Sequence, residues 1–181
     1  MSKKQTGRVF IVMGVSSTGK STIGEALAKK FLAKFIDGDD LHPKANILKM
    51  ENGYALEDED RVPWLERIGD VAYSIQRKNE TAFIVCSALK KKYRQQISAG
   101  NTNINFIYLH GDFELVKARM QVRRGHFMPI QLLNSQFDTL EIPQEDEVNV
   151  VRIDIRGSQE QVLERCTLAI QNIISGNCKV N

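Results

Sequence analysis

The residues from Gly14 to Ser21 read GVSSTGKS and match the pattern G-x-x-x-x-G-K-[ST] of phosphate-binding loops. Glycines at this spacing let successive backbone N–H groups point at one anion, and the start of a following helix adds positive charge. Lys20 can reach the β- and γ-phosphates of a nucleoside triphosphate, while the Ser21 hydroxyl can ligate Mg²⁺. We therefore predict that this loop and the residue after it bind the nucleotide: Gly14, Val15, Ser16, Ser17, Thr18, Gly19, Lys20, Ser21 and Thr22.

Two carboxylates, Asp37 and Asp39, lie two residues apart at the end of a short apolar run, with Gly38 between them. In an α/β sheet the carboxyl ends of the strands line the ligand crevice, so both can lie beside the phosphate loop. One can support Mg²⁺, and the other can accept the proton of an attacking hydroxyl group. We assign Asp39 as the base and Asp37 as the metal support, although exchanged roles, or a turn of capping aspartates, fit the pattern too.

Cationic side chains follow the acidic block 57–60 and the strand predicted at 81–86. An arginine fork can bind a substrate carboxylate through two parallel hydrogen bonds, and Arg61 and Arg94 are the candidates for that role. A second group of cations, before the predicted lid, could neutralise the transferring phosphoryl group or simply complement the end of a helix. The candidates on the acceptor side are His42, Arg61, Lys90 and Arg94, and those on the lid side are Arg119, Arg123 and His126.

Strands and helices must alternate to bring these residues together. Continuous apolar runs predict five buried strands, at about 9–13, 35–37, 81–86, 104–109 and 148–153. Helical periodicity predicts helices at about 21–33, 43–51, 60–78, 90–99, 112–124, 129–140 and after Ser158. The pattern indicates an α/β fold with three layers and a five-stranded parallel sheet. We expect a single domain over 1–181, with a core at about 7–39, 80–124 and 148–176, a substrate-side helical insertion at about 40–79 and a lid at about 125–147.

Composition restricts the class of protein. The 181 residues include 25 Lys and Arg against 22 Asp and Glu, and this excess of +3 is too small to indicate a nucleic-acid partner. Aromatic residues make up only 7 %, which also argues against stacking on bases. The longest strongly apolar run, 9–15, is far shorter than a membrane span, and the first residues lack the pattern of a signal peptide. With three cysteines of no metal-ligand spacing, we expect a cytoplasmic protein with reduced thiols and no membrane partner.

Taken together, several segments resemble the gluconokinase family of small P-loop kinases along almost the full chain. They are 14–21, 37–43 (DGDDLHP), 58–65 (DEDRVPWL), 86–90 with Tyr93 and Arg94, 124–129 (RGHFMP), 135–137 (SQF), and Leu140 with Glu141. The resemblance implies phosphorylation of D-gluconate to 6-phospho-D-gluconate by ATP and Mg²⁺, an adenylate/shikimate-kinase-like core, and a homodimer. It makes the acceptor-side residues, with His126, the gluconate contacts. Ser17-Thr18 stands where the family often has Gly-Ser, so Ser17 must adopt a conformation that glycine takes freely.

Other readings of the same residues remain. Spacing alone would also fit a kinase for shikimate or a nucleoside monophosphate on the same core. A nucleotide-sensing module that binds without turnover is a different class, but such a module has no need of an acceptor base like the pair Asp37 and Asp39.

Overall fold

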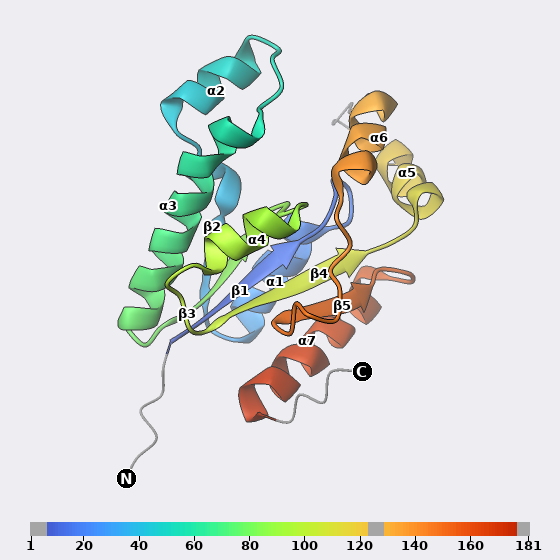
Figure 1. The fold of residues 1–181 in the computed structure, drawn as a ribbon. Helices are drawn as coiled ribbons and strands as arrows, with labels where there is room; N and C mark the ends of the chain where they lie inside the picture. Colours follow the sequence, from blue (N-terminus) through green and yellow to red (C-terminus); the bar gives the residue numbers. More distant parts are fainter. Residues whose placement is uncertain (1–6, 123–128, 177–181) are drawn as a thin grey trace.

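A computed structural model describes residues 7–122 and 129–176 of the chain. Its centre is a five-stranded sheet in the order β2-β3-β1-β4-β5, in which every neighbouring pair is parallel (Figure 1). The elements are β1 (Arg8–Met13), α1 (Lys20–Lys30), β2 (Lys34–Asp37), the 3₁₀ turn η1 (Gly38–Leu41), α2 (Lys44–Glu51), α3 (Asp58–Arg77), β3 (Thr81–Val85), α4 (Lys91–Ser98), β4 (Ile104–His110), α5 (Phe113–Val122), α6 (Ile130–Thr139), β5 (Val150–Asp154) and α7 (Gln159–Ser175). The predicted α/β fold and parallel sheet are confirmed.

The sheet is covered on both faces. Along β1, Phe10 and Val12 pack in one apolar cluster with residues of α1 and α7, whereas Val9 and Ile11 pack in a second cluster with residues of α3 and α4. All four side chains are fully buried. A strand that is buried on both faces has no polar side to expose, which explains the continuous apolar run in the sequence.

Helix α3 is part of the core. Trp64, Leu65, Ile68, Ala72 and Ile75 are buried in the second cluster and cover the sheet beside β1 and β3. The helix therefore serves as the crossover between β2 and β3. The predicted boundaries of the substrate-side insertion, 40–79, thus include a core helix, and the part that stands off the sheet in Figure 1 is α2 with the loop that follows it.

Helix starts follow the expected caps. The Asp112 carboxylate accepts a hydrogen bond from Leu115 N at 2.9 Å at the start of α5, and Ser158 caps α7 in a reciprocal capping box with Gln161.

Within the described ranges, no helix combines the length and the apolar character needed to cross a membrane.

Candidate active site

The phosphate loop connects the end of β1 to the start of α1. Its glycines adopt left-handed conformations, with φ of +143° at Gly14 and +94° at Gly19. A Cβ atom on Gly14 would lie 2.6 Å from the carbonyl oxygen of Leu109, so the loop and β4 can approach this closely only without a side chain there. Ser17 has a φ of +63°, which confirms that it takes a conformation that glycine adopts freely. A non-glycine residue in this region costs about 1–2 kcal/mol.

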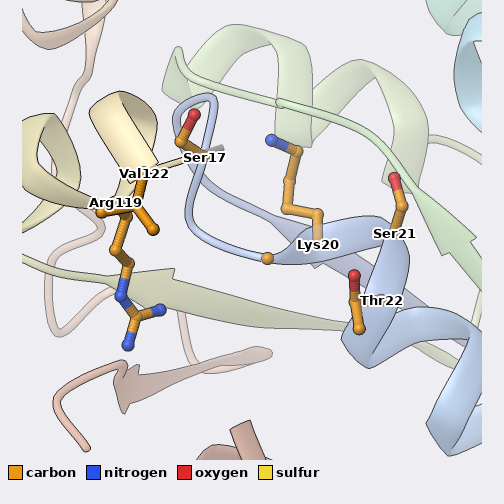
Figure 2. A pocket seen from close by; sticks show the side chains of 7 residues that line it. Ser17, Lys20, Ser21, Thr22, Arg119 and Val122 are labelled. Atoms are coloured by element: carbon orange, nitrogen blue, oxygen red, sulfur yellow. The ribbon is translucent and has the colours of Figure 1, made fainter. Parts of the chain in front are cut away.

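A cavity of about 270 Å³ lies against the loop and the first turn of α1 (Figure 2). Its lining comprises Ser17, Gly19, Lys20, Ser21, Thr22, Arg119 and Val122. Lys20 Nζ donates to the carbonyl oxygen of Val15 at 2.9 Å, and the buried hydroxyl of Thr18 donates to the same oxygen at 2.8 Å. The side chain of Thr18 therefore supports the loop from inside. The backbone N–H groups and the Lys20 amine are the cationic and dipolar groups that a bound phosphate requires.

The predicted acceptor carboxylates follow β2 in a fixed turn. The Asp37 side chain accepts a hydrogen bond from Asp39 N at 3.0 Å and so caps η1. A Cβ atom on Gly38 would lie 2.3 Å from the carbonyl oxygen of Val85, so the turn packs directly on the end of β3. Asp37 thus has a local structural role, in addition to the metal-supporting role predicted for it.

The Asp39 carboxylate interacts electrostatically with Lys20 of the phosphate loop. Its pKa is raised, first because the surrounding protein limits its solvation and second because Asp37 repels it; His42 and Lys20 oppose the shift. The side chain is nevertheless 81 % exposed, so it is open to a ligand although protein surrounds it on several sides. Asp39, Lys20 and Asp37 all also influence the pKa of the Cys86 thiol, which burial raises to about 12. The ends of β1, β2 and β3 therefore meet at one place.

Trp64 holds the turn Gly38–Leu41, called the acceptor turn below, and this role was not predicted from the sequence. Its indole Nε1–H donates to the carbonyl oxygen of Gly38 at 2.7 Å, and its ring stacks on His42 with 4.1 Å between ring centroids. Asn46 Nδ2 lies 3.2 Å from His42 Nδ1, while His42 Nε2 lies 4.0 Å from the Asp39 carboxylate. Burial lowers the pKa of His42, which favours a neutral imidazole. Trp64 is the single tryptophan, on an apolar helix face, and a side chain with one polar atom in such a place was a signal for a buried hydrogen bond.

The predicted cations Arg61 and Lys90 lie at the junction of α3 and α4. Arg61 donates to the carbonyl oxygen of Leu56 at 2.6 Å, and its guanidinium group lies 5.8 Å from the centre of the Tyr93 ring. Lys90 Nζ contacts both oxygens of Asp58, at 3.0 and 3.1 Å. Asp58 is the centre of this cluster, because the Lys92 amine and the Tyr93 hydroxyl also donate to it. Lys90 and Arg61 both flank the Tyr93 ring and are only partly buried.

Arg94 does not face the site, which contradicts its prediction as the ligand of a substrate carboxylate. The side chain is 2 % exposed, and its Nε and Nη2 atoms bind the two Glu147 oxygens at 2.7 and 2.8 Å. Nη1 donates to the carbonyl oxygens of Ala88 and Leu89, and Nη2 donates also to that of Glu141. These five bonds engage all the donors of the guanidinium group. The helix periodicity placed Arg94 beside Lys90 but could not show that an acidic partner would come from residue 147.

On the lid side, Arg119 lines the cavity and donates to the carbonyl oxygens of Ile155 and Gly157, in the loop after β5. Figure 2 shows its guanidinium group pointing away from Lys20. Arg123 and His126, the other lid-side candidates, lie outside the described residues. Helix α6 also reaches the phosphate loop: the Gln136 side chain accepts from Ser16 N at 2.6 Å.

The residues present fit a Mg²⁺ ion held together with a nucleotide. Ser21 offers a hydroxyl oxygen at the cavity wall, and Asp37 and Asp39 offer carboxylate oxygens at the end of β2 and in the turn that follows it. In the part of the chain that the structure describes, no three His, Cys, Asp or Glu side chains form a metal-binding group. Mg²⁺ suits such a sparse site, because it is usually held by one or two protein ligands, waters and substrate phosphates.

Comparison with known proteins gives a consistent result. The family model described as shikimate kinase matches residues 16–171. The thermosensitive gluconokinase of Escherichia coli is 56 % identical over 164 residues, which cover 91 % of this chain and 88 % of that protein. The thermoresistant gluconokinase of the same organism is 46 % identical and covers 86 % of this chain and 89 % of that protein.

Solved structures agree in fold. The crystal structure of a gluconokinase from Sinorhizobium meliloti superposes with a TM-score of 0.84 at 38 % identity, over 96 % of this chain and 97 % of that one. Shikimate kinase from Aquifex aeolicus gives a TM-score of 0.60 at 15 % identity, over 93 % of this chain and 98 % of that one, which is a likeness of fold alone.

Proposed function

Because the chain belongs to the gluconokinase family, we propose that it transfers the γ-phosphoryl group of ATP to a hydroxyl group of D-gluconate, giving 6-phospho-D-gluconate and ADP. The observation that carries this proposal is the identity of 56 % with one gluconokinase over 91 % of the chain. The geometry supports it, since an exposed carboxylate stands beside a phosphate loop, as transfer to a hydroxyl group requires.

In the proposed reaction the chain mainly positions and neutralises charge. The loop N–H groups and Lys20 hold the β- and γ-phosphates, and Asp39 accepts the proton of the attacking hydroxyl group. A bond forms between the hydroxyl oxygen and the γ-phosphorus, while the bond from that phosphorus to the β–γ bridging oxygen breaks and ADP leaves. The raised pKa of Asp39 makes its carboxylate a stronger base than that of an ordinary aspartate.

For the acceptor, we propose that Arg61 and Lys90 bind the gluconate carboxylate and its nearest hydroxyl groups, and that His42 hydrogen-bonds to the polyol chain. The two cations are partly exposed and flank the Tyr93 ring, and the charge of Arg61 acts on His42, the residue that follows the acceptor turn. Lys90 already pairs with Asp58, so substrate would share or replace that ion pair. The Nδ1 atom of His42 faces the Asn46 amide, so the Nε2–H of a neutral His42 is the group left to donate to a hydroxyl oxygen.

We further propose that Ser21 would hold Mg²⁺ with Asp37 in support, and that the ion would offset the negative charge of the phosphates. Arg119 then lies at the nucleotide side of the cavity. A homodimer remains a proposal that rests on the family resemblance, and size-exclusion chromatography with light scattering tests it. A cytoplasmic location remains a proposal that rests on the sequence.

A panel of acceptors tests the function. Purified protein with Mg-ATP is offered gluconate, shikimate, AMP or no acceptor, and ADP release is measured. We expect rapid release with gluconate only. Equal release with all four would refute the assignment to gluconate, and release with shikimate alone would favour the function named by the matching family model.

A further inference from the structure

One amide side chain joins α6 to the phosphate loop. Gln136 Oε1 accepts from the backbone N–H of Ser16 at 2.6 Å, and Gln136 Nε2 donates to Ser16 Oγ at 3.0 Å. Donor and acceptor of the same amide therefore both bind one residue that lies 120 positions away in sequence. Figure 1 shows α6 beside the loop that leaves β1.

Helix α6 is a firm support for this contact. Leu133, one turn before Gln136, is fully buried in the core cluster that contains α1 and α7. Phe137 packs edge-on against Phe113 of α5, with 5.3 Å between ring centroids. An amide on a packed helix holds its partner more exactly than one on a free loop would.

Gln136 contacts the loop directly before the residue whose backbone conformation is unfavourable. Ser16 is followed by Ser17, whose φ of +63° is unfavourable for a residue with a side chain. On the other side, Lys20 and Thr18 both donate to the carbonyl oxygen of Val15. The peptide between Val15 and Ser16 is thus held through its oxygen by the loop itself and through its N–H by Gln136. Ser17 lines the phosphate cavity, whereas Ser16 and Gln136 are outside the set of described residues that line it.

We propose that Gln136 is a positioning residue that braces the Ser16–Ser17 turn in the shape that binds phosphate. The proposal rests on the proposed function only in taking the loop as a nucleotide site. A neutral amide suits the position. A carboxylate could accept from Ser16 N, but it could not donate to Ser16 Oγ and would place negative charge beside a polyphosphate.

Equilibrium binding of Mg-ADP, measured by titration calorimetry, tests the brace without any acceptor and so separates it from the assignment to gluconate. We expect Gln136→Ala to raise the Kd for Mg-ADP about tenfold, and Gln136→Glu to raise it at least as much. The KM for gluconate should change less than twofold. Gln131→Ala, at an exposed glutamine of the same helix, is the matched control and should bind as the wild type does.

The same substitution made in a Ser17→Gly background shows whether Gln136 stabilises the backbone conformation of Ser17. Glycine takes a positive φ freely, so in Ser17→Gly the loop needs less support, and Gln136→Ala should weaken Mg-ADP binding there by less than threefold. Unchanged or tighter Mg-ADP binding in Gln136→Ala would overturn the proposal. An equal loss of Mg-ADP affinity in the wild-type and Ser17→Gly backgrounds would also overturn it. So would a lower melting temperature in Gln136→Ala together with similar changes in the KM for ATP and the KM for gluconate.

Discussion

The carbonyl oxygen of Gly38 and the indole nitrogen of Trp64 are 2.7 Å apart, and this hydrogen bond ties the acceptor turn to a core helix. The turn carries Asp39 on one side and leads to His42 on the other, and His42 stacks on the same indole ring. The position of the candidate base is therefore supported by a side chain that is itself buried in the core.

Trp64→Phe keeps the aromatic ring and removes the donor. The Gly38 oxygen then loses its partner, and we expect a loss of about 1–3 kcal/mol in the free energy of unfolding. We also expect a raised KM for gluconate with little change in the KM for ATP. Steady-state kinetics and thermal melts measure both. Tyr73→Phe, which removes a hydroxyl group from the exposed face of the same helix, is the control; an equal effect of the two substitutions would contradict the role of the indole N–H.

Asp39→Asn removes the proposed base while preserving the size of the side chain. We expect kcat to fall by roughly 10²-fold or more, the scale of lost general-base catalysis, with Mg-ADP binding retained. Asp40→Asn, at an exposed carboxylate of the same turn, is the matched control and should keep near-normal turnover. Normal kcat in Asp39→Asn, together with a large loss in Asp37→Asn, would exchange the roles of the two carboxylates.

The raised pKa of Asp39 predicts the acid limb of the rate profile. A base acts only when deprotonated, so kcat/KM falls as the pH drops through its pKa. Because that pKa is raised from 3.8, the fall should begin at a higher pH than for an ordinary aspartate. Initial rates from pH 4 to 8 measure the limb. Asp39→Asn should flatten it, and an unaltered limb in that variant would assign the titration to another group.

We expect Arg94→Met to lower the stability of the folded protein. Removing one member of a buried ion pair leaves Glu147 buried without its partner, which typically costs about 3–5 kcal/mol. For a chain of this size that corresponds to a melting temperature lower by on the order of 10 °C. Gln95→Met, at the adjacent exposed position of α4, is the control. A raised KM for gluconate at an unchanged melting temperature would instead return Arg94 to the substrate site.

Asp58→Asn should destabilise the junction of α3 and α4 in a pH-dependent way. Hydrogen bonds from Lys92, Tyr93 and Lys90 lower the pKa of Asp58 in the folded protein. A depressed pKa contributes stability above the ordinary value of 3.8 and loses it as the pH falls towards the folded value. The difference in melting temperature between wild type and Asp58→Asn should therefore be largest near neutrality and shrink below pH 4. A difference that is constant with pH, or one matched by the exposed control Glu59→Gln, would contradict this.

Local sequence information was sufficient for the sheet and the phosphate loop. The buried strands β1, β3 and β4 appear as apolar runs, whereas β2, also predicted as buried, has no buried residue. The spacing of Gly14, Gly19 and Lys20 has few structural meanings. The motif also predicted the positive φ of Ser17, which follows from the position of that residue in the loop. Periodicity also predicted the helix over 60–78 but not its place in the core, because a pattern shows which face is apolar and not what covers it.

Partners from distant segments could not be predicted. Arg94 and Glu147 are 53 residues apart, and Ser16 and Gln136 are 120 apart. Nothing in the spacing of charges distinguishes an arginine that awaits a substrate from one that a buried glutamate already binds. For Trp64 a local signal existed, since a buried indole N–H needs an acceptor, but the acceptor itself came from the turn after another strand.

The order of the strands fixes the separation of donor and acceptor. Strand β3 lies between β1, which leads into the phosphate loop, and β2, which leads to Asp39. Neighbouring strands are about 4.8 Å apart, so the two strand ends are separated by about 10 Å. A pair of substrates that reaches from the loop to Asp39 has to bridge this distance across the end of β3. The residue at that intervening end, Cys86, is buried, and its raised pKa favours the uncharged thiol, so it adds no charge between the two strand ends.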